Sequence, residues 1–219
     1  MIEIIPTVVP QDISDVEAAQ KRYASFAKAI HIDACNETLA PNDTWLPKEG
    51  DRLPKCGSTT YEAHLMIAEP LEIGHAYIRA GASRLIAHVE SFSSIDQARG
   101  TIDAWRSGGA KEVGLAALLE TPLEALEPLA QLCDVVLLMT IAHIGKQGSP
   151  FDRRGIERIV ALRHTFPKLC IAADGGISES VIDVLVRSGA SRLCVGSAIV
   201  TAQDPAQVFR SLNERATIQ

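Results

Sequence analysis

The heptapeptide RAGASRL at residues 79–85 returns as RSGASRL at 187–193, and RSGGAKEV at 106–113 is a weaker third copy. Each copy joins the end of an amphipathic run to a glycine and then to an apolar run. Glycine supplies the positive φ that often ends a helix, so each copy predicts the same helix-to-strand joint. Two short matches can also arise by chance from common turn chemistry, but a repeated joint is typical of a fold built from similar αβ units.

The rest of the chain continues this alternation of strands and helices. Short apolar runs predict eight strands, and the amphipathic runs between them predict seven helices. Eight strands in 219 residues favour an α/β fold closed as a TIM (β/α)8 barrel over an open doubly wound sheet. We expect a single domain over residues 1–219. The predicted strands are 3–9, 29–34, 60–67, 84–89, 112–117, 135–140, 169–173 and 192–196, and the predicted helices are 12–28, 70–80, 94–107, 123–132, 153–165, 179–188 and 205–215.

One segment breaks the alternation. Residues 42–59, NDTWLPKEGDRLPKCGST, hold two prolines and two glycines where a second helix is due. Both residue types oppose helix interiors. We therefore expect an irregular segment in place of the second helix, with at most one short helical turn.

The composition argues against several classes of protein. A net charge of −6 makes nucleic acid and anionic membranes poor partners, so an anionic substrate must be held by a local arrangement. No run of about 18 apolar residues predicts a membrane span, and the N-terminus is typical of a strand rather than a signal peptide. Five scattered cysteines without a CxxC motif fit reduced thiols and a cytoplasmic location.

Polar residues close several of the predicted strands, at the end of a barrel where active sites lie. His31 and Asp33 end the second strand on one face, His64 lies near the end of the third, and Asp174 ends the seventh; His88 lies near the end of the fourth. Singly, each fits a core pair or, for Asp174, a helix N-cap. Together, the first four would suit a divalent ion such as Zn²⁺, Fe²⁺, Mn²⁺ or Co²⁺.

Glycine-containing loops follow the last three predicted strands. DGGI at 174–177 and GSAI at 196–199 each lead from a strand toward a helix. Glycines let backbone N–H groups approach an anion, and a helix N-terminus adds partial positive charge, so these loops predict a phosphate site. Residues 143–148, after the sixth strand, form either a loop that closes over a ligand or an ordinary surface loop.

These motifs resemble those of the ribulose-phosphate 3-epimerase family. IHIDACNETLAPN at 30–42 is similar to its HxDxMDGxFVPN segment, and EAHLMIAEP at 62–70 is similar to its DVHLMxxxP segment. LLMTIAHIGKQGSPF at 137–151 resembles VMTVxPGFGGQxF, while AADGGI at 172–177 and VGSAI at 195–199 match its DGG and GSAI loops. The resemblance runs from about residue 4 to about residue 205 and is poorest over 42–59.

The resemblance implies a metal-dependent isomerase that epimerises a phosphorylated ketose, most directly D-ribulose 5-phosphate to D-xylulose 5-phosphate of the pentose phosphate route. Two carboxylates would move the proton through a metal-stabilised enediolate. One divalent ion (Zn, Fe, Mn or Co), a small phosphorylated sugar and a homo-oligomer are the expected cofactor and partners. The implied metal ligands are His31, Asp33, His64 and Asp174, of which Asp33 and Asp174 are also the acid/base pair. The implied substrate contacts are Thr7, Met66, Met139, Gly145, Gly148, Gly175, Gly176, Gly196 and Ser197.

Departures from the family pattern leave alternatives open. The MDG of the second loop is CNE at 35–37, the sixth loop has one extra residue, and a Lys-Pro pair after strand five is LL at 118–119. These changes alter the substrate walls, so a different ketose such as allulose 6-phosphate stays possible. A related phosphosugar lyase or decarboxylase would carry DxKxxD at the third strand, where EAHLMIAE at 62–69 has no lysine. A non-catalytic barrel that binds a phosphorylated metabolite is the third alternative.

Overall fold

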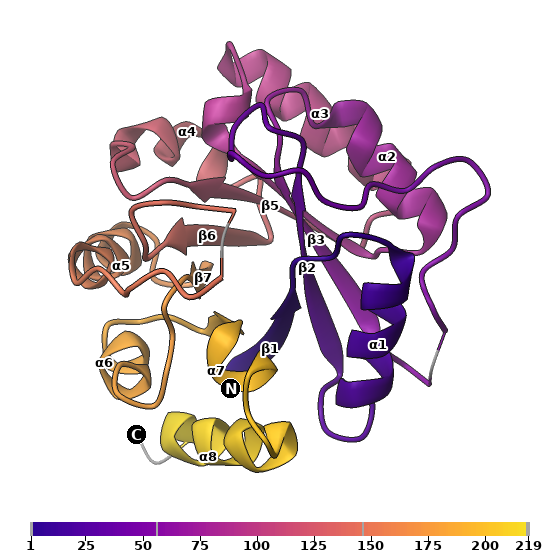
Figure 1. Cartoon of the computed structure of the whole chain (residues 1–219). Coiled ribbons are helices and arrows are strands. Elements are labelled where there is room, and N and C mark those ends of the chain that lie inside the picture. Colours follow the sequence, from indigo (N-terminus) through magenta and orange to yellow (C-terminus); the bar gives the residue numbers. More distant parts are fainter. Residues whose placement is uncertain (1, 56, 146, 218–219) are drawn as a thin grey trace.

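A computed structural model describes residues 2–55, 57–145 and 147–217. Eight parallel strands form a closed barrel in chain order, with β1 paired to β8 (Figure 1). This confirms the predicted α/β TIM barrel. The strands are β1 (Glu3–Val8), β2 (Ala29–Cys35), β3 (Thr60–Met66), β4 (Arg84–His88), β5 (Glu112–Ala117), β6 (Val135–Met139), β7 (Cys170–Asp174) and β8 (Arg192–Val195).

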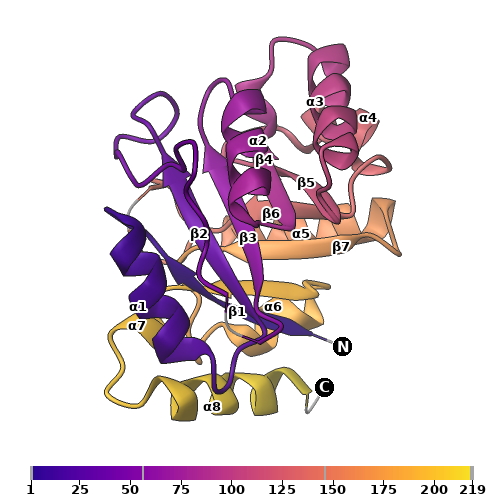
Figure 2. The ribbon, with the colours of Figure 1, turned by 90° about the vertical axis from the view of Figure 1, so that its right-hand side faces the viewer.

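The helices lie around the outside of the barrel, with α1 and α8 near each other in both views (Figures 1 and 2). Within the described residues no helix is long and apolar enough to cross a membrane. The helices are α1 (Ile13–Tyr23), α2 (Leu71–Ala80), α3 (Ile95–Ser107), α4 (Glu127–Ala130), α5 (Arg154–Thr165), α6 (Ile182–Arg187), α7 (Ser197–Val200) and α8 (Pro205–Thr217), with 3-10 turns η1 (Val89–Ser91) and η2 (Leu123–Ala125).

The repeated helix-to-strand joint is present at all three predicted places. Gly81, Gly109 and Gly189 have φ of 115°, 106° and 107°, and each precedes a barrel strand. The Gly81 N–H also bonds the carbonyls of Tyr77 and Ile78 at the end of α2. Positive φ without a steric penalty is the property that these positions require of glycine.

The segment between β2 and β3 is irregular, as predicted. Its described residues contain no helix, and its chain lies against α2. The Tyr77 hydroxyl donates to the Trp45 carbonyl at 2.9 Å, and the two rings meet edge to face with centroids 5.8 Å apart. Leu53 is also buried, and its N–H donates to the Ala80 carbonyl at the end of α2 at 2.8 Å, so the segment packs where a helix would otherwise lie.

Strand alternation decides which side chains enter the barrel. Ile30, Ile32 and Ala34 of β2 belong to the large core between the strands and the surrounding helices. His31 and Asp33 alternate with them and therefore face the barrel interior. A second, smaller apolar cluster fills the interior and includes Met66, Ile86, Leu137, Met139 and Cys194.

Candidate active site

Four polar side chains converge at the C-terminal end of the barrel interior. Strand register sets them there: Asp33 on β2 pairs with His64 on β3, and Asp174 is the last residue of β7. One ligand-type atom from each of His31, Asp33, His64 and Asp174 lies within 4.8 Å of the others. The structure thus brings together all four residues of the predicted metal set.

The distances within this cluster are those of a compact centre. Asp33 Oδ1 lies 3.3 Å from His31 Nε2 and 3.1 Å from His64 Nδ1. Asp174 Oδ2 lies 4.0 Å from His31 Nε2 and 3.5 Å from His64 Nδ1. Both histidines are fully buried, and each carboxylate is 12% exposed, so the cluster opens to solvent on the carboxylate side.

These residues fit a divalent cation. His31 Nε2 is buried and has no hydrogen-bond partner among the described residues, although two carboxylates face it. A buried polar atom without a partner is costly, and a bound cation would satisfy it. Two imidazole nitrogens and two carboxylate oxygens are a donor set suited to divalent transition metals. The cluster is therefore able to hold a metal ion.

Electrostatics at the centre favour charged groups. Burial raises the pKa of Asp33, but its contacts with His31 and His64 outweigh this effect and hold that pKa below its usual range. Burial lowers the pKa of His31, yet its neighbours Cys194, Asp33 and Glu62 together raise it well above the usual value. The pKa of His88, which touches His64, is lowered by burial. Asp33 is therefore ionised at neutral pH, while His88 is neutral.

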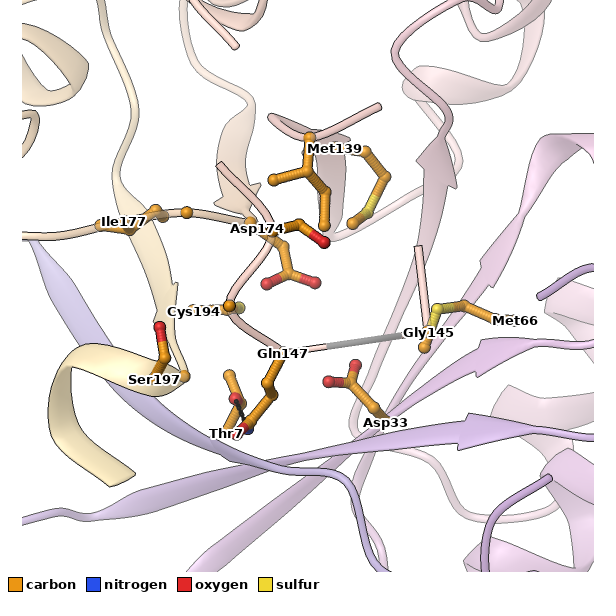
Figure 3. A pocket seen from close by; sticks show the side chains of 16 residues that line it. Thr7, Asp33, Met66, Met139, Gly145, Gln147, Asp174, Ile177, Cys194 and Ser197 are labelled. Atoms are coloured by element: carbon orange, nitrogen blue, oxygen red, sulfur yellow. Dashed lines mark hydrogen bonds between the residues drawn. The ribbon is translucent and has the colours of Figure 1, made fainter. Parts of the chain in front are cut away.

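A pocket opens above the cluster and holds about 470 Å³ of empty space, including its open mouth. Figure 3 shows the Asp33 and Asp174 carboxylates pointing toward each other across it. Every predicted substrate contact lines this pocket, whereas His31 and His64 are fully buried and are not among the lining residues. The predicted residues in the lining are Thr7, Asp33, Met66, Met139, Gly145, Gly148, Asp174, Gly175, Gly176, Gly196 and Ser197.

Backbone from the β7 and β8 loops forms one side of the pocket. Gly176 has φ of 66°, and a Cβ there would lie 2.5 Å from the Phe151 nitrogen, so a larger residue does not fit. A Cβ on Gly196 would lie 2.8 Å from Thr7 Oγ1. Both glycines thus bring main chain close to the pocket, as an anion-binding loop requires.

Described residues of the loop after β6 line the pocket and contact β1 and the segment after β2. Gln147 Nε2 donates to Thr7 Oγ1 at 3.2 Å (Figure 3), and Asn42 Nδ2 donates to the Gly145 carbonyl. These contacts hold the loop at the edge of the pocket, and Lys146 within it lies outside the described residues.

Five lining residues were missed by the sequence reasoning. Cys194 had a usable signal, because it lies on β8 two residues before the predicted contact Gly196, which follows the strand directly. The others lie in or just after loops, where no period marks the inward side. The missed residues are Ile141, Gln147, Ser149, Ile177 and Cys194.

Comparison with solved structures supports the fold. The chain superposes on 3-hexulose-6-phosphate synthase from Salmonella typhimurium with a TM-score of 0.73 and 15% identity, covering 98% of each chain. KGPDC from Streptococcus mutans gives a TM-score of 0.71, with 9% identity over 100% of this chain and 99% of that one. At these identities the likeness concerns the fold alone. Barrel, pocket and polar cluster together define a TIM-barrel enzyme.

Sequence comparison then identifies the family. The chain belongs to the ribulose-phosphate 3 epimerase family, which it matches over residues 3–200, and it is accordingly an isomerase. The cytoplasmic isoform of ribulose-phosphate 3-epimerase from Oryza sativa subsp. japonica is 29% identical over 97% of this chain and 93% of its own. The epimerase of Aquifex aeolicus is 32% identical, with coverages of 86% and 84%. That of Chlamydia muridarum is 31% identical, with coverages of 89% and 86%. The predicted resemblance is confirmed.

Proposed function

We propose that this protein epimerises a phosphorylated ketose at the carbon next to the ketone, interconverting D-ribulose 5-phosphate and D-xylulose 5-phosphate. The observation that carries the proposal is the pair of carboxylates, Asp33 and Asp174, which face each other across the pocket (Figure 3). Family membership supports the same reaction, since the matched relatives are named for it. The reaction belongs to pentose phosphate metabolism.

Two opposed carboxylates can exchange a proton on one carbon. Epimerisation removes a carbon-bound proton from one face of the sugar and returns a proton to the other face. One carboxylate accepts the proton while the other, protonated, donates its own. Asp33, which the two histidines keep ionised, accepts the proton in one direction, and Asp174 donates. The roles exchange in the reverse direction.

We also propose that His31, Asp33, His64 and Asp174 hold one divalent ion, which is Zn²⁺, Fe²⁺, Mn²⁺ or Co²⁺. The unpartnered Nε2 of His31 and the donor set support this assignment. When bound, such an ion supplies Lewis-acid stabilisation of the negative charge that develops on the substrate oxygens.

The phosphate is proposed to bind the backbone of the β7 and β8 loops. The described part of the pocket lining contains no lysine or arginine, and backbone N–H groups near Gly176 and Ser197 are the proposed contacts to the phosphate. Met66 and Met139 form an apolar wall, and Thr7, Gly145 and Gly148 lie at the remaining contacts. A homo-oligomer stays a prediction, as does a cytoplasmic location, which the name of the rice relative supports.

Proton exchange in D₂O tests the reaction. The metal content of the purified protein is measured, and the protein is then incubated with ribulose 5-phosphate or allulose 6-phosphate. We expect deuterium at the carbon next to the ketone together with xylulose 5-phosphate. Activity on allulose 6-phosphate alone would move the substrate to another ketose. Absence of exchange with both sugars would favour a barrel that binds a metabolite without turning it over.

Asp174→Asn tests the acid–base pair. We expect turnover to fall on the order of 10²-fold or more, because the amide can neither accept nor donate the proton. Asp103→Asn changes an exposed aspartate on α3 and is the matched control, with normal turnover expected. Metal content is measured for both variants, so that loss of the ion is separated from loss of proton transfer. Near-normal turnover of Asp174→Asn would refute the assigned role.

A further inference from the structure

The two histidines of the polar cluster present different nitrogens to it. His31 turns Nε2 toward Asp33, and His64 turns Nδ1 toward the same carboxylate. The other nitrogen of each ring points away from the cluster. His31 Nδ1 lies 2.7 Å from Glu62 Oε1, and His64 Nε2 lies 2.9 Å from His88 Nε2. A neutral histidine that binds a metal must carry its only N–H on the outer nitrogen.

Glu62 sets this tautomer for His31 directly. Its carboxylate is fully buried, and Oε2 accepts from Arg192 at 2.7 Å while Oε1 faces His31 Nδ1. A carboxylate can only accept, so His31 Nδ1 must donate. In the neutral ring that metal binding requires, the lone pair of His31 is then on Nε2, the atom without a hydrogen-bond partner in the described structure.

His64 reaches the same state through a second histidine. His88 Nδ1 lies 3.2 Å from Glu90 Oε2, so His88 Nδ1 carries the N–H. When His64 binds a metal through Nδ1, the other nitrogen of His88, Nε2, must be the acceptor in the contact with His64 Nε2. A bond between two imidazole nitrogens needs one donor and one acceptor, so His64 Nε2 must donate. The lone pair of His64 is left on Nδ1, facing the cluster.

The hydrogen-bonded series Glu90–His88–His64, called the relay below, is fixed by its surroundings. The His64 and His88 rings have centroids 5.0 Å apart and planes 19° from parallel, and both side chains are fully buried. Glu90 Oε1 accepts from the Leu118 N–H at 2.8 Å and from the Thr121 hydroxyl. The loop after β5 therefore fixes which carboxylate oxygen is available to His88.

We propose that Glu90, acting through His88, is a positioning residue that fixes His64 in the tautomer whose Nδ1 can bind a divalent ion, as Glu62 does for His31. The proposal rests on the metal site of the proposed function. Groups that orient metal-binding histidines in this way typically account for about 10- to 100-fold in metal affinity.

Glu90→Gln should reverse the donor and acceptor roles along the relay while keeping a side chain of the same size at position 90. The Leu118 N–H can only donate, so the amide oxygen of Gln must face it and the amide NH₂ must face His88. His88 Nδ1 then accepts, His88 Nε2 donates, and His64 is left with its N–H on Nδ1, which blocks metal binding. Glu90→Ala removes the carboxylate but imposes no direction on the relay.

The experiment measures Co²⁺ affinity by chelator competition, together with the Co²⁺ absorption spectrum and the Tm of the metal-free proteins. We expect Glu90→Gln to lose about 10- to 100-fold in affinity, with a changed spectrum, and Glu90→Ala to lose less. A purely structural role predicts the opposite order, since alanine removes more contacts. Glu120→Gln, an exposed glutamate paired with Arg154, is the matched control and should bind as wild type.

The possible outcomes distinguish a failure of the relay proposal from a failure of the proposed metal site. Unchanged affinity in Glu90→Gln, or a greater loss in Glu90→Ala, overturns the relay while the metal site stands. If the wild-type protein itself binds no Co²⁺ or Zn²⁺, the proposed metal site is wrong and the relay falls with it.

Discussion

Glu37 occupies a backbone conformation that side chains disfavour. Its φ is 61°, and it is the one non-glycine residue with positive φ in the described chain. It lies in the exposed loop after β2, at the position where the family pattern has the glycine of MDG. The left-handed region costs a residue with a Cβ about 1–2 kcal/mol, part of which the lower chain entropy of a non-glycine residue offsets.

Glu37→Gly is therefore expected to stabilise the protein by about 0.5–1 kcal/mol. Denaturant unfolding of the metal-free protein measures the change. Glu49→Gly makes the same substitution in an exposed turn at negative φ and should destabilise by about the same amount. Equal losses in the two variants would show that Glu37 is not strained.

The predictable part of the site was the part encoded along single strands. His31 and Asp33 were placed on one inward face by their spacing of two, and Asp174 by its position before two glycines. His88 was noted at a strand end but given no role. Its partner Glu90 lies in η1, and the groups that fix Glu90 come from the loop after β5. The local sequence of a loop does not predict its contacts with another loop.

At the scale of elements, Gly74 marks where α2 meets α3. A Cβ on Gly74 would lie 2.3 Å from Cε2 of the fully buried Trp105, whose Nε1 donates to the Leu71 carbonyl at 3.0 Å. Gly100, in α3, has nothing within 4 Å of its Cβ position. The two helical glycines therefore differ only in their surroundings.

We expect Gly74→Ala and Gly100→Ala to change stability in opposite directions. Helix propensity alone favours alanine by about 1 kcal/mol at both positions. At Gly74 the displaced indole should reverse this and leave a net loss of about 1–3 kcal/mol, whereas Gly100→Ala should keep most of the gain. Urea unfolding of both variants measures the two signs. A stabilised Gly74→Ala would show that the α2–α3 contact is loosely packed.

Helix positions were easier to predict than helix lengths. The predicted helix at 123–132 is a 3-10 turn followed by the single turn of α4, and the prolines at 122 and 128 limit how many backbone N–H groups can bond there. The predicted helix at 179–188 begins only at Ile182. Amphipathic spacing identified both segments. The residue at which regular helical hydrogen bonding begins depends instead on how the chain enters each segment in the folded barrel.

For the whole molecule, a charged network on the barrel floor joins strands that are far apart in sequence. Arg192 of β8 donates to Glu3 of β1 at 2.9 Å, to Glu62 of β3 at 2.7 Å and to Glu112 of β5 at 2.7 Å. Arg84 of β4 pairs with Glu3 and Glu112 as well. Through Glu62 the network reaches His31, so the same residues that tie the barrel together also support the candidate metal centre.

Arg192→Met is expected to cost about 3–5 kcal/mol of unfolding free energy at neutral pH, because it leaves the fully buried carboxylate of Glu62 without its cation. Arg215→Met, which removes only exposed ion pairs with Glu179 and Asp183, should cost less than about 1 kcal/mol. Denaturant unfolding of the metal-free proteins compares the two. Similar losses in both variants would mean that the floor network adds little to the closed barrel.

The cost of Arg192→Met should also depend on pH in a defined direction. Burial raises the pKa of Glu62, but the hydrogen bond from His31 and the charge of Arg192 outweigh it and lower that pKa from 4.5 to about 2. The stability that Glu62 contributes is therefore complete above its unfolded pKa and is lost as the pH falls toward 2. The difference between wild type and Arg192→Met should be widest above pH 4.5 and should narrow as Glu62 becomes protonated. A difference that stays constant down to pH 2 would show that lost side-chain packing, not uncompensated charge, causes the destabilisation.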